Sequence, residues 1–260
     1  MTLAEVTTPS GDTLVVHEGW RQGRGAFGGL TIAAAIRAIE QRVADPRRVV
    51  RSVTAELPAP TLPGEAAVEV DILRSGSSLT VARAALRQRD EVTTHVVAVL
   101  AASRPVDEAG WQELSPPSAP AWESLAPIEM QSGAFPEFAL NFEYRLVSGI
   151  PFGGRGEPVT VGYIRAREPG EPRDAAFIAA MMDAWWPATL VRQKGPRPLA
   201  TIAYTLEIVD GVAGLDRDAP LLYRGTVPVN RDGYFLETRE LWGGDGRLVA
   251  RNHQTFAIIR

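Results

Sequence analysis

The stretch GGLTIAAAIRAIEQRVA, residues 28–44, decides the fold together with the residues that come after it in the chain. Its apolar residues recur at helical spacing and Pro46 stops the run, so the stretch predicts a helix. Four long strand-like segments come next, and only tight turns separate them. Strands joined by tight turns must pair antiparallel. The stretch therefore predicts one helix followed by an antiparallel meander.

Period-two alternation marks the four strand-like segments, and turn residues lie between them. They are RRVVRSVTAEL, EAAVEVDILRSG, SLTVARAALRQ and VTTHVVAVLAAS. The same order recurs after a second predicted helix, Arg173–Leu190, which Asp174 can cap and Pro187 ends or kinks. Its strands are PLATIAYTLEIV, APLLYRGTVPV, GYFLETRELW and GRLVARNHQTFAII. Shorter strand candidates precede each helix: TLVVHE before the first, LNFEYRLV and PVTVGYIRA before the second.

This repeated order predicts an internal duplication. A Pro-rich segment with little periodicity separates the copies, as is typical of a linker. We therefore predict an N-terminal domain at residues 1–105, a linker at 106–136 and a C-terminal domain at 137–260. One helix wrapped by a long antiparallel sheet is the hotdog architecture. The predicted fold class is α+β, a double hotdog with two long antiparallel sheets, each around a central helix.

Composition narrows the classes of function. A net charge of −4 offers no basic surface for nucleic acid, and no apolar run approaches the roughly 18 residues of a membrane span. The N-terminal residues lack the basic and apolar segments of a signal peptide. With no cysteine, the chain has no thiolate for catalysis or metal binding. The three histidines are not at metal-ligand spacing. We expect a cytoplasmic protein without a metal or cofactor.

A glycine pattern, Gly23-x-Gly25-x-x-Gly28, matches the dinucleotide-binding fingerprint. That fingerprint belongs to a parallel sheet in which strands alternate with helices. The meanders predicted here are antiparallel, and the acidic residue at the right spacing, Asp45, lies in a loop after the helix. Nicotinamide or flavin binding is therefore disfavoured.

The residues themselves point to a family. The stretch WRQGRGAFGGLTIAAA, residues 20–35, resembles the segment leading into the first helix of the type II acyl-CoA thioesterases. The second half adds ATI at residues 200–202, and LVA at 248–250 with Gln254. The resemblance runs in order over nearly the whole chain. It implies a double hotdog enzyme that hydrolyses acyl-CoA or acyl-carrier-protein thioesters and forms homo-oligomers.

The resemblance also implies three catalytic residues. In that family an Asp, a Thr and a Gln of the second hotdog hold and activate the water that attacks the thioester. These positions fall on Asp183 in the second helix, Thr201 at the start of the next strand and Gln254 in the last strand. Asp183 is then the general base, and the two neutral side chains fix the water.

Each of the three residues also has a plainer interpretation. Asp183 is the only charge between residues 175 and 191, so it is either buried with a function or at a helix edge facing water. Thr201 suits any strand, and Gln254 could be an outward-facing strand residue. The two tryptophans after the Asp, Trp185 and Trp186, are unusual beside the family pattern, and we expect them to bind the acyl group.

Two glycines and several arginines leave alternatives open. Gly28 and Gly29, at the start of the first helix, could polarise the thioester carbonyl or line the acyl channel, or could simply allow a tight turn and close packing. The first helix has only Ala33–Ala35 where the second has its acid, which predicts one site per chain. Basic side chains could contact coenzyme A phosphates or form a solvated face; they are Arg47, Arg48, Arg51 and Arg74.

Thioester hydrolysis is thus the predicted function. The alternative is a hotdog module that binds acyl thioesters without catalysis, or one that catalyses another thioester reaction such as hydration or dehydration.

Overall fold

The computed structural model describes residues 1–210, 216 and 218–259. The first half contains α1 (Leu3–Val6), β1 (Thr13–Val16), η1 (Glu18–Trp20), β2 (Arg21–Gln22), β3 (Gly25–Ala26), α2 (Gly28–Val43), β4 (Arg48–Glu56), β5 (Gly64–Ser75), β6 (Leu79–Gln88) and β7 (Glu91–Ala102). The second half contains η2 (Trp122–Ser124), η3 (Glu137–Asn141), β8 (Phe142–Ser148), β9 (Val159–Ala166), α3 (Ala175–Asp183), η4 (Ala188–Val191), β10 (Leu199–Ile208), β11 (Leu221–Arg231), β12 (Tyr234–Trp242) and β13 (Leu248–Ile258). Every predicted strand segment is confirmed.

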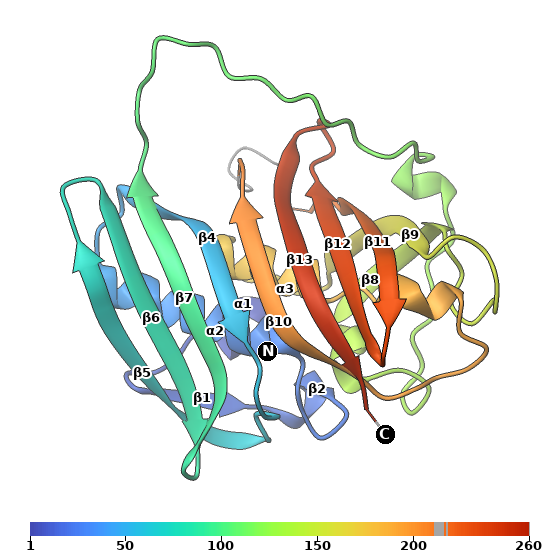
Figure 1. Cartoon of the computed structure of the whole chain (residues 1–260), viewed down its shortest axis with the longest axis horizontal. Helices are drawn as coiled ribbons and strands as arrows, with labels where there is room; N and C mark the ends of the chain where they lie inside the picture. The colour runs from blue at the N-terminus through green and yellow to red at the C-terminus, as the bar shows by residue number, and fades with distance from the viewer. Residues whose placement is uncertain (211–215, 217, 260) are drawn as a thin grey trace.

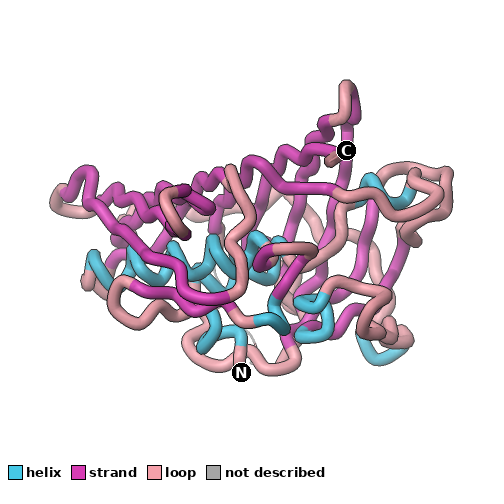
Figure 2. The backbone as a smooth tube through the Cα atoms, turned by 90° about the horizontal axis from the view of Figure 1, so that it is seen from below, coloured by secondary structure: helices cyan, strands magenta, loops and turns pink. Residues whose placement is uncertain are grey.

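One antiparallel sheet runs through both halves in the order β1-β5-β6-β7-β4-β10-β13-β12-β11-β9-β8. The halves join where β4 pairs with β10, with Val53 opposite Leu206 (Figure 1). The helices lie together on one side of this sheet, which curves over them (Figure 2). The predicted double hotdog is confirmed, and its two sheets are continuous at the β4–β10 pair.

The two central helices differ in how closely they follow their predicted bounds. Helix α2 ends at Val43, and Ala44 follows in the left-handed conformation that commonly terminates helices. Helix α3 is shorter than predicted, because it begins at Ala175 and ends at Asp183 rather than near Leu190. Asp174 caps its start, as predicted, by accepting a hydrogen bond from the Phe177 amide at 3.0 Å. Pro187 lacks an amide hydrogen and disfavours a helical residue before it, so the chain turns there and continues as η4.

Helices α2 and α3 pack directly against each other. A Cβ atom built on Gly29 of α2 would lie 3.1 Å from the Cα atom of Ala180 in α3. Most of both helices is buried in one hydrophobic core that also includes the inner face of the sheet. This close approach brings the start of α2 to the end of α3, at the junction of the two halves.

The segment between the halves lies against the C-terminal half. It arches from the end of β7 across to the strands at the other end of the sheet (Figure 1). The Trp122 ring lies under the Arg145 guanidinium, 4.0 Å from its central carbon, and the Ile128 amide donates to the Tyr144 carbonyl at 2.8 Å. The domain bounds at residues 105 and 137 stay predictions.

None of the helices in the described part of the chain has the length and apolar character needed to cross a membrane.

Candidate active site

Asp183, the last residue of α3, is a buried acid whose side chain is 7% exposed. Its Oδ2 atom accepts a hydrogen bond from the backbone amide of Gly29 at 2.6 Å, and its Oδ1 atom accepts one from Nε2 of Gln254 at 3.0 Å. Gly29 is the second residue of α2, so the positive end of that helix faces the carboxylate. Of the two interpretations of Asp183, the buried one agrees with the structure.

The other two predicted residues are linked to Asp183 by hydrogen bonds. Gln254 on β13 is 2% exposed, and its Oε1 atom accepts a hydrogen bond from the Thr201 hydroxyl at 3.0 Å. A chain of hydrogen bonds thus runs from Thr201 through Gln254 to Asp183. Helix α3 and two neighbouring strands each supply one member. The structure brings all three residues together.

A β-bulge turns Thr201 toward the site. The register between β10 and β13 shifts between Thr201 and Ala203, which makes Ile202 the extra residue. Thr201 consequently pairs with Phe256, two positions from Gln254 and on the same face of β13. In a regular strand Thr201 would face the opposite side of the sheet.

Sequence reasoning missed two buried charges on β12. Arg239 is 1% exposed, and its Nε atom donates to Oε1 of Glu237 at 2.9 Å. Its Nη1 atom donates to the Met182 carbonyl at 3.1 Å and lies 3.6 Å from Oδ1 of Asp183. The available signal was the spacing of two in ETRELW, which puts both side chains on one face of a strand. That spacing is equally common on exposed strands.

Burial shifts the pKa values of this pair and of two neighbouring tyrosines. Burial raises the pKa of Glu237, although Arg239 opposes the rise. Burial lowers the pKa of Arg239, but the negative charges of Glu237 and Asp183 outweigh it, so the net shift is upward. Burial also raises the pKa of Tyr223 and Tyr204 well above the ordinary value. Both tyrosines are therefore neutral, and Tyr223 donates to Glu237 at 3.2 Å.

The glycines at the start of α2 make room for Asp183. A Cβ atom on Gly28 would lie 3.1 Å from Oδ2 of Asp183 and 3.2 Å from a Leu57 methyl carbon. One on Gly29 would lie 2.5 Å from the Phe27 ring and 2.9 Å from Cβ of Asp183. Both distances are too short for Gly29 to carry a side chain without displacement of its neighbours. Close packing is thus one function of these glycines, and the Gly29 amide holds the acid.

The two tryptophans after Asp183 have different surroundings. Trp185 is 1% exposed, stacks on Tyr223 with ring centroids 5.1 Å apart, and donates its indole N–H to the Thr160 hydroxyl at 3.1 Å. Trp186 is half-buried and lies 4.4 Å from Trp185 and 5.8 Å from Tyr144, measured between ring centroids. Trp185 belongs to the core, and a role in acyl binding stays a prediction for both residues.

The first half repeats the backbone of this site without its chemistry. Strand β4 has the same register shift against β7, between Val50 and Ser52. Aligning the two shifts places Val50 where the second half has Thr201, and Ala98 where it has Gln254. Similarly, Ala82 and Ala84 of β6 correspond to Glu237 and Arg239 of β12. These four counterparts are all apolar and buried.

The counterpart of Asp183 differs from the sequence prediction. Just as Asp183 of α3 reaches the start of α2, Arg37 of α2 reaches the start of α3, where its Nε lies 3.2 Å from Oδ2 of Asp174. Arg37, rather than Ala33–Ala35, therefore occupies the equivalent helix contact.

Two of the arginines considered above bind Asp45, in a loop. Asp45 binds Arg47, whose hydrogen bond lowers the pKa of that acid to about 2. Arg48 also binds Asp45 and donates to the Gly76 carbonyl at 2.7 Å. It thereby links the loop after α2 to the turn between β5 and β6. Arg51 and Arg74 are exposed, and His253 is exposed on the face of β13 opposite Gln254.

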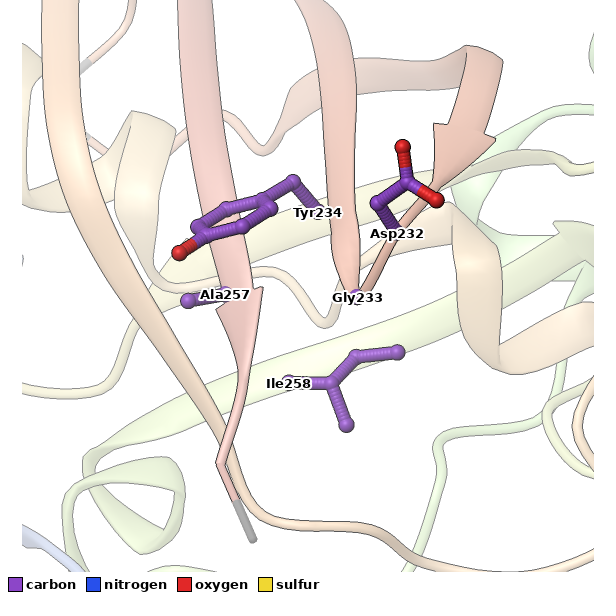
Figure 3. A pocket seen from close by; sticks show the side chains of 5 residues that line it. All are labelled: Asp232, Gly233, Tyr234, Ala257 and Ile258. Carbon is purple, nitrogen blue, oxygen red and sulfur yellow. The ribbon is translucent and has the colours of Figure 1, made fainter.

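A surface hollow of about 570 Å³ lies elsewhere, where β12 begins and β13 ends. Its lining comes from the β11–β12 turn and the end of β13: Asp232, Gly233, Tyr234, Ala257 and Ile258 (Figure 3). None of the groups hydrogen-bonded to Asp183 lines it. The hollow is separate from the candidate active site.

Two family models match the chain. The acyl-CoA thioesterase N-terminal domain matches residues 16–103, and the acyl-CoA thioesterase C-terminal domain matches residues 113–258. The second match alone covers more than half of the chain, which belongs to the acyl-CoA thioesterase family. None of the curated proteins matches it.

Solved structures share the fold. A hot dog fold protein of unknown function from Alicyclobacillus acidocaldarius is 23% identical, with a TM-score of 0.88 over 99% of this chain and 98% of that one. A putative thioesterase II from Thermobifida fusca YX is 21% identical, with a TM-score of 0.84 over 100% and 98%. The acyl-CoA thioesterase II TesB2 from Mycobacterium marinum is 18% identical, with a TM-score of 0.77 over 99% and 98%.

Proposed function

We propose that this protein hydrolyses acyl-CoA thioesters with a water molecule activated by Asp183. The family supports the substrate class. The observation that carries the mechanism is the hydrogen-bonded chain from Thr201 through Gln254 to the buried Asp183 carboxylate. A buried acid next to two neutral polar side chains can bind water and accept its proton.

The proposed reaction has two steps. As the water oxygen bonds to the thioester carbon, Asp183 takes one proton and the carbonyl becomes an oxyanion. When the carbonyl forms again, the carbon–sulfur bond breaks and the coenzyme A sulfur leaves with the proton held by Asp183. The products are a carboxylic acid and free coenzyme A thiol, and the carboxylate of the enzyme is restored.

The other residues supply position and polarisation. Thr201 and Gln254 orient the water, which replaces a diffusional encounter with a positioned attack. The Gly29 amide is bonded to Asp183, so the Gly28 amide, the first of α2, is the better donor for the oxyanion. Trp186, which is only half-buried, forms part of the acyl pocket, and Trp185 supports it from the core.

The test is thiol release from a panel of acyl-CoA and acyl-carrier-protein thioesters. Asp183→Asn keeps the shape of the side chain and removes its basicity, so we expect kcat to fall by roughly 10²- to 10⁴-fold. Asp174→Asn, at the other end of α3, is the matched control, because Asn caps a helix as well as Asp does. Its kcat should stay near that of the wild type.

Two outcomes contradict the proposal in different ways. If the wild type binds acyl thioesters but releases no thiol from any of them, the protein is a binding module. If Asp183→Asn hydrolyses as fast as the wild type, the hydrolase remains but the assignment of its base is wrong.

A further inference from the structure

Glu237 and Arg239, two buried charges of β12, hold the backbone on both sides of Asp183. Arg239 donates to the carbonyl of Met182, the residue before the acid. Glu237 accepts, through Oε2, from the amide of Ala188 at 3.1 Å, just after the Pro187 turn. The cation therefore lies at the carboxyl end of α3, where free carbonyls favour positive charge. Together the pair fixes the segment that carries the acid.

The same pair sets the electrostatic surroundings of the acid. Arg239 lies 2.9 Å from Glu237 but 3.6 Å from Asp183, so much of its charge is compensated by the nearer carboxylate. The other groups facing Asp183 are the Gly29 and Gln254 amides and the neutral phenols of Tyr204 and Tyr223.

The first half has no counterpart of this ion pair. The equivalent positions of the first half are Ala82 and Ala84, both buried and packed in the core. A hotdog sheet therefore folds at this point with alanines alone. Burying an ion pair commonly costs more free energy than an apolar replacement, so its presence beside Asp183 calls for a function.

We propose that Arg239 is a positioning residue that holds the Asp183 carboxylate, and that Glu237 offsets enough of its charge for Asp183 to accept a proton from water. This inference rests on the proposed hydrolysis. Neither residue touches the thioester; both act through Asp183.

The experiment measures kcat, KM and the pH dependence of kcat/KM for wild type, Arg239→Gln, Arg239→Lys and Glu237→Gln. For Arg239→Gln we expect kcat to fall roughly 10- to 100-fold with little change in KM. The acidic side of its pH profile should move to higher pH, because a cation that favours the ionised carboxylate is gone. For Glu237→Gln the acid limb should move down, since Arg239 then acts uncompensated. Arg239→Lys keeps the charge, so its acid limb should stay near that of the wild type while kcat falls.

The matched control is Arg37→Gln, which removes the other buried arginine at the α2–α3 contact. It should lower the melting temperature without moving the acid limb. Circular dichroism establishes which variants fold, and Arg239→Lys, which keeps the buried charge, provides the test if the glutamine variants do not.

Two results overturn the inference. One is an acid limb that moves in the same direction in Arg239→Gln and Glu237→Gln, or in neither. The other is a folded Arg239→Lys with wild-type kcat. Both leave the proposed hydrolysis intact. A wild type that releases no thiol removes the hydrolysis, and this inference with it.

Discussion

At the scale of single residues, two hydrogen-bond donors and one cation, from three elements, stabilise the buried Asp183. The Gly29 amide comes from α2, the Gln254 amide from β13 and the Arg239 guanidinium from β12. Desolvation of a carboxylate costs several kcal/mol unless such partners are present. The residue types of the triad could be predicted from the sequence, because a family pattern carries them. Arg239 could not, since its burial depends on the packing of the whole half.

The Thr201 hydroxyl can be tested alone. Thr201→Val keeps the shape of the side chain but removes the hydrogen bond to Gln254, so we expect kcat to fall about 10-fold, as is typical when one positioned group is lost. Thr201→Ser keeps the hydroxyl and should retain most of the activity. Equal activity of the two variants in a thiol-release assay would show that the hydroxyl has no part in catalysis.

Glu40 makes the free energy of unfolding depend on pH. Burial, together with the charge of Asp174, raises the pKa of Glu40 to about 7 in the folded protein, from 4.5. A raised pKa means that the folded state binds the proton more tightly. The contribution to stability is therefore complete below about pH 4.5 and is lost as the pH rises through 7.

Glu40→Gln cannot ionise and should avoid that loss. Relative to the wild type, we expect the variant to gain about 1–3 kcal/mol in free energy of unfolding between pH 5 and pH 8. Urea denaturation at the two pH values measures the difference. A variant whose stability changes with pH in parallel with the wild type would show that Glu40 is already ionised at pH 5.

At the scale of elements, the close contact of α2 with α3 places the acid. The helices and strands could be predicted from apolar periodicity and turns, which are local signals. The end of α3 at Asp183 and the bulge at Ile202 could not, because each depends on packing against strands distant in the sequence. The bulge matters most, since it turns Thr201 toward Gln254. Sequence alternation alone assigns it to the wrong face.

Gly29→Ala tests the helix contact. The added methyl group would lie 2.9 Å from Cβ of Asp183 and 3.1 Å from Cα of Ala180, so α2 and α3 must separate. We expect a loss of about 1–3 kcal/mol in free energy of unfolding, the usual cost of overpacking a core, and a lower kcat. Gly19→Ala, where a Cβ would meet nothing within 4 Å, is the control. Equal stability of the two variants by thermal denaturation would contradict tight packing at Gly29.

At the scale of the whole molecule, the duplicated halves form one structure. The sheet continues through the β4–β10 pair, and the core includes side chains from both halves. Sequence analysis could predict two copies, because each has its own helix and strands. It could not predict that the site lies between them, since this depends on how the helices meet.

This continuity predicts one unfolding transition rather than two. Cooperative unfolding is expected when neither half can lose its structure without exposing the core of the other. Far-UV circular dichroism reports on both halves. Tryptophan fluorescence reports mainly on the second half and the segment before it, which contain four buried or half-buried tryptophans: Trp122, Trp185, Trp186 and Trp242. The two signals should give coincident curves in urea. Separate midpoints would mean that the halves unfold independently.

The hydrogen bond from Gly29 to Asp183 joins residues 154 positions apart. It ties the start of α2 in one half to the end of α3 in the other. Under the proposed mechanism, a side chain at Gly29 would displace Asp183 and so lower turnover at an acid that the other half supplies. Exchanging the first half for the corresponding half of a distant homologue should therefore lower turnover before it lowers stability.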